Sequence, residues 1–419
     1  MILFLYNEHV LIRVLLLIKI HKKNLKRVRK MIEENEEKTP LRMFFLDNLK
    51  ILLTILVIMQ HTMMTYGDLG DWYFKEPNTD AVSSFIFIIL SGLNQGFFMA
   101  LFFFVSAYFV PKSYNRKGPK KFLKDRFIRL GIPFLIYIAI VNPVMEYILF
   151  YVTEMNFFEF YALQFQSFEG IWDFLSGNGP LWFLLALMIF AVCYCIWRQI
   201  FQTNSDKETV KKPPSNTILG TIIIIMTVFT FLMRIIFPVN AGDAFLNIQL
   251  AHVVQYIIML ILGVIAFKRD WFHNISDKQG KMWLIIALLS IIYFFILGIA
   301  AGATEGGNIT ILLGGLHWEA FAFTLWESIY CMGMCIGLMT LFRKKWNTQG
   351  KVSKKIFANS YTMYLIHAPV LVGVSIILVV IPIFALLKFV IVLAIVFLLC
   401  FLISNFILRR IPGTKRVLG

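Results

Sequence analysis

The chain has 419 residues, of which 59% are hydrophobic and only 15% are charged, and its formal net charge is +16. Soluble domains carry roughly 25% charged residues, so this composition excludes an ordinary soluble protein and indicates an integral membrane protein. The positive charges fall in short clusters between long apolar runs, which is typical of membrane proteins and not of a nucleic-acid-binding face, so we expect no nucleic-acid partner.

Residues 1–41 precede the first clear membrane span. Their first half is apolar but interrupted by charged residues, and a basic run follows it. A signal peptide carries its positive charges before the apolar stretch, so this order argues against one. We interpret the segment as a basic cytoplasmic or interfacial region and assign no function to it.

Ten apolar runs follow, each close to the ~20 residues that cross a bilayer. They predict an all-α, polytopic membrane helix bundle of about ten transmembrane helices over residues 42–408, with a short basic cytoplasmic tail at 409–419. Every even-numbered connection is basic, so both termini are expected to be cytoplasmic. The predicted spans are residues 44–65, 86–110, 129–152, 180–200, 216–237, 246–267, 282–302, 320–342, 357–380 and 385–408.

Two polar residues of the first span, Lys50 and His61, are eleven positions apart. On an α-helix this step is three turns plus about 20°, so both side chains lie on one stripe, roughly 16 Å apart along the axis. Asp47 shares the stripe and could pair with Lys50. Ionisable groups inside a membrane are costly unless they line a cavity or meet partners. The stripe therefore suggests a path across the membrane to a proton-transfer group.

His61 lies in the outer third of its span and is the candidate general base. An imidazole with an unperturbed pKa of about 6.5 can take a proton from a hydroxyl at neutral pH. The alternative is a histidine that is hydrogen-bonded between helices and has no part in catalysis. The residue alone does not decide between the two.

Arg126 and Arg129 stand at the entrance to the third span, three positions apart, and so share a helix face. Two guanidinium groups there could grip phosphates through forked hydrogen bonds. Arginines at a cytoplasmic helix end are also what the positive-inside rule predicts, so spacing alone favours the ordinary interpretation.

Glu327 lies deep in the eighth predicted span. A carboxylate at that depth could orient His61 or pair with Lys50 or Arg234. Arg234 itself lies near the outer end of its span, as does His252, and both are interpreted as side chains that snorkel to water.

His367 lies near the middle of the ninth span, and Pro369 just after it frees backbone groups that a histidine could satisfy. Trp182, at the start of the fourth span, is interpreted as an anchor at the membrane interface.

All five cysteines fall within apolar runs. No histidine or carboxylate near Cys331 and Cys335 completes a metal site, so we expect no metal. We interpret all five as small buried hydrophobic residues.

Four pieces of sequence, in one order, resemble the signatures of a known family. Together they make the chain similar to the acyltransferase-3 family of integral membrane O-acyltransferases over residues 42–408. The pieces are Asp47, Lys50 and His61; FFVSA at 103–107 followed by Arg126 and Arg129; LWFLLAL at 181–187; and SYTMYLIHAP at 360–369.

The chain departs from the usual family pattern at two places: Lys50 stands where arginine is commoner, and Ser106-Ala107 stands where many members have Ser-Gly. Within the family, residues 131–133 (GIP) and 255–271 look most like the glucan-biosynthesis protein C branch, which is associated with succinylation of glucans.

The resemblance implies an enzyme that moves an acetyl or succinyl group from cytoplasmic acyl-coenzyme A to a hydroxyl of an extracytoplasmic carbohydrate. The acyl-coenzyme A would be a co-substrate, with no cofactor tightly bound, and the protein would lie in a bacterial plasma membrane. His61 would be the general base. Lys50 would orient the first span or contact the donor, with Asp47 holding it in place, and Arg126 and Arg129 would contact the phosphates of the donor.

The resemblance leaves the acyl group and the acceptor open. A cation such as Arg234 could stabilise the oxyanion or read the carboxylate that distinguishes succinyl from acetyl. The acidic, aromatic stretch at 152–179 is where we expect sugar contacts, because aromatic rings stack on sugar faces.

Two other classes compete with an acyltransferase. A transporter or flippase would suit ten spans with intramembrane charges, but comparing spans one to five with six to ten reveals no counterpart to Lys50–His61, and many transporters have related halves. A non-catalytic scaffold would leave the intramembrane His61 and Glu327 without a reason.

Overall fold

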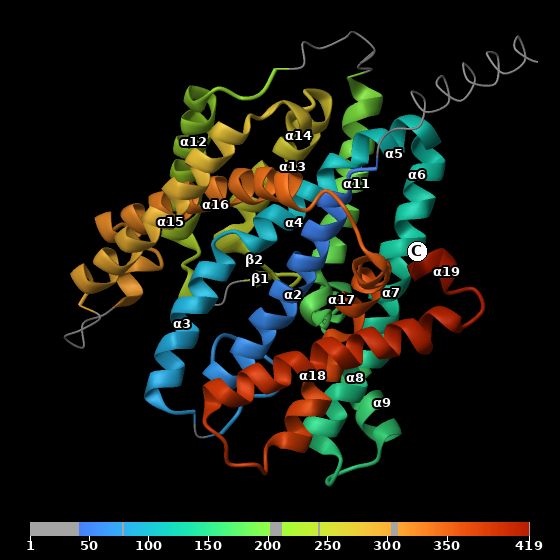
Figure 1. Cartoon of the computed structure of the whole chain (residues 1–419). Coiled ribbons are helices and arrows are strands. Elements are labelled where there is room, and N and C mark those ends of the chain that lie inside the picture. Colours follow the sequence, from blue (N-terminus) through green and yellow to red (C-terminus); the bar gives the residue numbers. More distant parts are fainter. Residues whose placement is uncertain (1–41, 78, 202–211, 242–243, 303–308, 419) are drawn as a thin grey trace, which may run out of the picture. The chain divides into compact units, whose positions relative to one another are not determined.

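A computed structural model gives the fold of the chain (Figure 1). The interpretation of residues 1–41 as a basic cytoplasmic or interfacial segment concerns residues that lie outside the described part of the chain. The residues described are 42–77, 79–201, 212–241, 244–302 and 309–418.

Ten helical segments are long and apolar enough to cross a membrane, which confirms the predicted all-α bundle. The second and third segments are longer than predicted, and the sixth begins later. The segments are Phe44–Gly67, Ala81–Lys117, Pro119–Tyr151, Gly179–Ile200, Asn216–Ile236, Leu250–Lys268, Asp277–Ala300, Trp318–Lys345, Lys351–Leu378 and Ala385–Arg410.

The second and third of these segments each contain several helices, and short elements fill the connections. The elements are α2 (Phe44–Gly67), α3 (Ala81–Gln95), α4 (Phe98–Tyr108), α5 (Val110–Lys117), α6 (Pro119–Arg126), α7 (Ile132–Ile136), α8 (Asn142–Glu146), α9 (Phe157–Ser167), α10 (Ile171–Ser176), α11 (Trp182–Ile200), α12 (Asn216–Ile236), β1 (Ala244–Phe245), β2 (Ile248–Gln249), α13 (Leu250–Lys268), α14 (Trp271–Asn274), α15 (Asp277–Ala300), α16 (Trp318–Lys345), α17 (Lys351–Leu378), α18 (Ala385–Phe406) and α19 (Lys415–Leu418).

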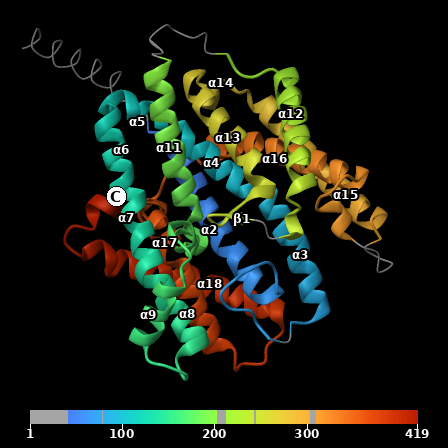
Figure 2. The same cartoon turned by 180° about the vertical axis from the view of Figure 1, so that it is seen from behind.

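The first span, α2, packs against helices from both halves of the chain. It contacts α3, α4, α16, α17 and α18, and in both views it lies between α3 and α17 (Figures 1 and 2). Leu46, Leu49, Leu53 and Val57 are buried at helical spacing, which is why this face of α2 turns inward. The intramembrane polar residues of α2 are thereby placed next to the last two spans.

The second and third spans are interrupted helices. The second span is interrupted between α3 and α4, where Gly96 and Phe97 are not helical. The third span alternates α-helical turns with π-helical turns, and Pro133 and Pro143, which lack a backbone N–H, stand near the starts of α7 and α8. Single π-helical turns occur frequently at functional sites. The π-helical turns are Phe127–Gly131, Tyr137–Val141 and Tyr147–Tyr151.

The sixth span begins later than predicted because a two-stranded hairpin precedes it. Strands β1 and β2 pair antiparallel, and the two turn residues, Leu246 and Asn247, have φ of 54° and 64°, as a tight type I′ turn requires. The side chain of Asn178 donates a 3.0 Å hydrogen bond to the Leu246 carbonyl. The hairpin is therefore tied to the turn that starts the fourth span.

Helices α15 and α16 pack at close range through glycines. In the membrane-spanning stretch of each helix, 72% of the residues of α16 are buried but only 17% of those of α15. Helix α16 is therefore the inner helix of the pair. A Cβ placed at Gly333 of α16 would lie 2.6 Å from the Trp283 carbonyl oxygen and 2.8 Å from the Ala287 Cβ. Gly337, one turn later, faces Leu284 in the same way. The two glycines form the small-residue face that lets membrane helices approach closely.

Gly333→Leu is therefore expected to destabilise the bundle by about 1–3 kcal/mol, the usual cost of overpacking. The thermal unfolding midpoint in detergent should fall. Gly298→Ala is the matched control. Gly298 belongs to α15 of the same helix pair, and nothing lies within 4 Å of the methyl group that the substitution adds. An unchanged midpoint for Gly333→Leu would contradict this packing.

Candidate active site

His61 of α2 is hydrogen-bonded to a histidine that is far away in sequence. Its Nδ1 lies 3.0 Å from Nε2 of His367 on α17, and the two ring centroids are 4.9 Å apart. His367 is fully buried, and its Nδ1 lies 2.5 Å from the Tyr364 carbonyl oxygen. Both histidines are candidates from the sequence alone, but their contact is not predictable from it.

This arrangement shows which nitrogen of each ring carries a proton. The Tyr364 carbonyl oxygen can only accept, so Nδ1 of His367 carries a hydrogen. Neutral His367 then offers Nε2 as an acceptor, and Nδ1–H of His61 donates to it. The lone pair of neutral His61 is therefore on Nε2, and a base at this position would act through that atom.

The predicted backbone contact of His367 is made, but with a different carbonyl. Pro369 deprives the Leu365 carbonyl of its usual helical donor. His367 bonds the carbonyl of Tyr364 instead, one residue earlier. The orientation of His367 is thus fixed by its own helix, and its side chain does not bond the Leu365 carbonyl that Pro369 leaves without a helical donor.

Trp72 covers the other side of His61. The two rings are stacked, with centroids 4.4 Å apart and planes at 21°. Trp72 is 9% exposed, and its indole N–H has no hydrogen-bond partner among the described residues. Nothing in the sequence indicated this contact, because Trp72 lies in a connection between two predicted spans.

That connection, Asp68 to Asp80 with residue 78 not described, is held against the bundle by a buried ion pair. Lys388 of α18 donates to Glu76 at 2.5 Å, and their side chains are only 2% and 11% exposed. The Glu76 N–H also bonds the Thr65 carbonyl at the end of α2. The last span therefore positions the loop that carries Trp72.

Tyr73, next to Trp72, belongs to a polar network with the third span. Its hydroxyl contacts the Tyr137 hydroxyl at 3.2 Å and donates to Asn142. Asn142 in turn donates to Glu146 at 2.7 Å, and Gln164 of α9 donates to the other Glu146 oxygen at 2.5 Å. Burial raises the pKa of Tyr73 above its usual value, so this hydroxyl stays protonated. The network places a carboxylate and two amides on the same side of the bundle as Trp72.

Lys50 and the arginine pair form one group of cations near the other end of α2. The Lys50 ammonium lies 4.2 Å from the centroid of the Phe109 ring, and the charges of both Arg126 and Arg129 act on it. The opposite charge of Asp47 also acts on Lys50, and the pairing of these two residues stays a prediction. Residues selected separately from the sequence are thus brought together.

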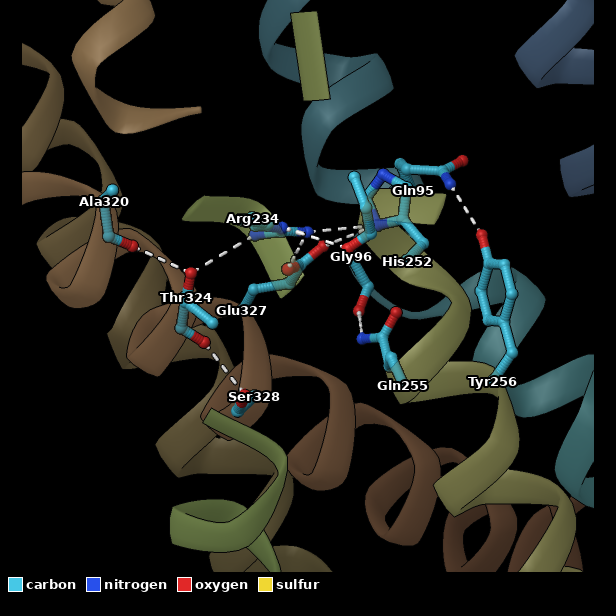
Figure 3. Close-up of polar contacts among 11 residues, drawn as sticks. Gln95, Gly96, Arg234, His252, Gln255, Tyr256, Ala320, Thr324, Glu327 and Ser328 are labelled. Carbon is cyan, nitrogen blue, oxygen red and sulfur yellow. Dashed lines mark hydrogen bonds and ion pairs between the residues drawn. The ribbon is translucent and has the colours of Figure 1, made fainter. Parts of the chain in front are cut away.

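Glu327 pairs with Arg234, one of its three predicted partners (Figure 3). An Arg234 Nη2 lies 2.6 Å from Glu327 Oε2 and 3.1 Å from His252 Nδ1, while Nε donates to the Ala251 carbonyl. Nη1 lies 3.4 Å from the Thr324 hydroxyl. Among the described residues, no hydrogen bond or ion pair joins Glu327 to either of its other predicted partners.

The prediction that Arg234 and His252 snorkel to water is wrong. Arg234 is 0% exposed and His252 is 3% exposed. The carboxylate of Glu327, on a different helix, supplies inside the bundle the partner that water would have supplied outside. Arg234 is thus already neutralised in this structure.

Trp182 is partly buried and packs within the bundle. Its ring stacks on Tyr256 with centroids 5.6 Å apart and lies 6.0 Å from that of Phe103. Tyr256 accepts a hydrogen bond from Gln95, at the break between α3 and α4 (Figure 3). The tryptophan thus links the fourth span to that break, a contact that the sequence did not indicate.

The cysteines are not all buried. Cys193 is exposed, whereas the other four cysteines are buried as expected. No group of three or more histidine, cysteine, aspartate or glutamate side chains that could hold a metal occurs in the described part of the chain.

Comparison with known proteins identifies a family and several relatives that match part of the chain. A family model described as an acyltransferase domain matches residues 43–405. Glucans biosynthesis protein C of Escherichia coli K12 is 26% identical over 232 residues, 54% of this chain and 58% of the relative. The protein of the same name from Salmonella heidelberg SL476 is 27% identical over 234 residues, with the same coverage. The chain thus spans little more than half the length of these relatives. No solved structure matches it.

Proposed function

The chain belongs to the acyltransferase domain family, and on that premise we propose that it transfers an acetyl or succinyl group from acyl-coenzyme A to a hydroxyl of a glycan. The ten membrane spans make it a membrane member of the family. A carbohydrate acceptor is supported by the name of the relatives, glucans biosynthesis protein C. The acyl-coenzyme A donor is supported by the group of cations around Lys50.

The donor and the acceptor are proposed to approach from opposite sides. Lys50, Arg126 and Arg129 lie on the side with the basic connections, which the positive-inside rule assigns to the cytoplasm of a bacterial cell. Trp72 and Tyr73 lie beyond the other end of α2, where an extracytoplasmic carbohydrate would arrive. Transfer would then take place inside the plasma membrane, at a histidine between the two sides.

The observation that carries the proposal is the hydrogen bond from His61 to His367, because it leaves the lone pair on His61 Nε2. In the proposed step the hydroxyl oxygen attacks the thioester carbonyl carbon while Nε2 takes the hydroxyl proton. The tetrahedral intermediate then collapses, the C–S bond breaks, and the thiolate of coenzyme A takes the proton back. His367 is a positioning residue here, since it orients His61 and does not touch the reacting atoms.

The function is tested by measuring free thiol released from acetyl- and succinyl-coenzyme A by the full chain in lipid nanodiscs. A cell-envelope glycan extract supplies the acceptor, and mass spectrometry detects the acyl esters. We expect thiol release that depends on the extract, together with an ester of matching mass. A transporter or flippase would instead release no thiol and would move a glycan across a sealed vesicle, and that outcome would overturn the proposal.

The arginine pair gives a second, more specific prediction. Arg126→Gln and Arg129→Gln each remove a charge-assisted bond to a donor phosphate, worth roughly 1.5–3 kcal/mol, so KM for acyl-coenzyme A should rise about 10–100-fold. The kcat should change much less, because neither side chain is proposed to touch the reacting atoms. Arg116→Gln, at an exposed arginine on the same side of the bundle, is the control. If Arg116→Gln raised KM as much as the other two variants, Arg126 and Arg129 would act only through the general positive charge of this side of the protein.

A further inference from the structure

A groove of about 610 Å³ lies where α2, the end of α16 and the start of α17 meet. Its volume falls within the roughly 300–1,000 Å³ range of small-molecule sites. It is open and mainly apolar, and no step of the proposed reaction uses it. The apolar side chains that line it are Ile51, Leu52 and Ile55 on α2, Phe342 and Trp346 on or just after α16, and Val352 and Ile356 on α17.

The groove is separate from the acyl-transfer site, although both involve α2. Ile51, Leu52 and Ile55 follow helical spacing and form one face of α2. At 100° per residue, that face is turned by about 100–200° from the stripe of Lys50 and His61. A ligand in the groove would therefore approach α2 from a different side than the donor and the acceptor do.

Polar contacts fix the shape of the groove. The Asn48 side chain donates to the carbonyls of Trp346 and Thr348 at 2.7 and 2.9 Å and accepts from Gln349 at 3.0 Å. The Asn347 side chain accepts from the Phe45 N–H at 3.2 Å. The connection between α16 and α17 is thereby held across the first turns of α2, so the groove is a built feature and not a gap beside a loose loop.

The rim of the groove is positively charged and lies at the level where the apolar spans end. Lys351 lines the groove directly, and Trp346 is 47% exposed, as a residue at the membrane interface can be. Of the five exposed lysines at these helix ends, only Lys344 has a carboxylate partner within the described ranges, at 3.6 Å. The five are Lys344, Lys345, Lys351, Lys354 and Lys355.

We propose that this groove binds one anionic phospholipid, with its acyl chains along the isoleucine floor and its phosphate at Lys351. An apolar floor at membrane depth and an unneutralised cationic rim at headgroup depth match the two parts of such a lipid. Basic pockets between membrane helices are known to bind anionic headgroups. The lipid would brace the connection that Asn48 holds across the start of α2.

The test measures lipid retention by the full chain, not activity, so it stands apart from the acyl-transfer proposal. Protein from nanodiscs with equal phosphatidylglycerol and phosphatidylcholine is mildly delipidated, and native mass spectrometry counts the lipids that remain. We expect one retained phosphatidylglycerol. Lys351→Gln should weaken its retention roughly fivefold, the effect of about one charge near an anionic headgroup. Ile55→Trp, which fills the floor, should abolish retention.

Lys112→Gln is the matched control, because Lys112 is an exposed lysine at another helix end. If Lys112→Gln weakens lipid retention as much as Lys351→Gln does, the lipid is attracted by all the basic residues of this side of the protein and the groove is not a specific site. Full retention in Ile55→Trp would overturn the proposal too. Added inorganic phosphate should not displace the lipid, and displacement would mean that the rim binds free phosphate. Lys351 is exposed, so its variant should fold normally and remains informative even if Ile55→Trp does not fold.

Discussion

His61→Ala is expected to lower the rate of acyl transfer by about 10²–10⁴-fold, the usual contribution of a general base. The variant loses the only group proposed to take the hydroxyl proton, while binding and positioning of both substrates persist, so a residual rate should remain. The measurement is kcat for thiol release at saturating acyl-coenzyme A. His273→Ala is the control, since that histidine is exposed and bonded to Asp270. An unchanged kcat in His61→Ala would make His61 a structural residue.

Two variants of His367 separate its positioning role from simple packing. His367→Leu removes the acceptor for Nδ1–H of His61 and should also reduce kcat, by less than loss of the base itself. His367→Gln places an oxygen where it could accept that hydrogen bond and should recover part of the rate. Equal rates in the two variants would show that the hydrogen bond does not position the base. Thermal midpoints measured in parallel report any loss of folding.

Glu327→Leu is expected to destabilise the protein by roughly 3–5 kcal/mol, because it leaves Arg234 charged and buried without its carboxylate. The measurement is the unfolding midpoint together with the folded fraction recovered in detergent. The double variant Arg234→Met/Glu327→Leu should recover most of the lost stability, since it removes both charges. A single variant as stable as the native chain would mean that the pair contributes nothing.

Activity of the same double variant decides what Glu327 does. If the variant is both stable and active, Glu327 serves only to neutralise Arg234. If it is stable but inactive, the pair takes part in transfer, acting through the helices that it joins, α12, α13 and α16 (Figure 3). Glu327 has no contact with His61 among the described residues, so any such role acts through the helices.

Local patterns predicted the spans well, because a span depends on composition and spacing within a single helix. Lys50 and His61 do lie on one helix, α2. Contacts between distant segments were not predictable in the same way. Nothing in the sequence near His61 indicates that His367, 306 positions later, accepts its hydrogen. The burial of Arg234 was missed because its position near the end of an apolar run favours snorkelling, and only the packed bundle brings Glu327 to it.

The loop that carries Trp72 was missed for a related reason. The sequence indicated only a connection between the first two spans, whereas the place of this loop over His61 depends on Lys388, in the last span. From the sequence alone, a lysine in an apolar run such as Lys388 indicates only an unfavourable burial of charge. Its partner, Glu76, lies more than three hundred residues earlier. Pairings of this kind need the three-dimensional fold, since neither residue identity nor periodicity specifies them.

The ion pair between Glu76 and Lys388 also has a consequence for biosynthesis. Spans enter the membrane in chain order, so the loop over His61 emerges early and waits for α18, the final helix, before it is fastened. His367, on the helix just before α18, likewise arrives late. A nascent chain with its first eight spans inserted therefore lacks both Lys388, which tethers the loop, and His367, which bonds His61. The two contacts that shape the proposed site, one to the loop and one to His61, therefore form only when the last two spans are in place.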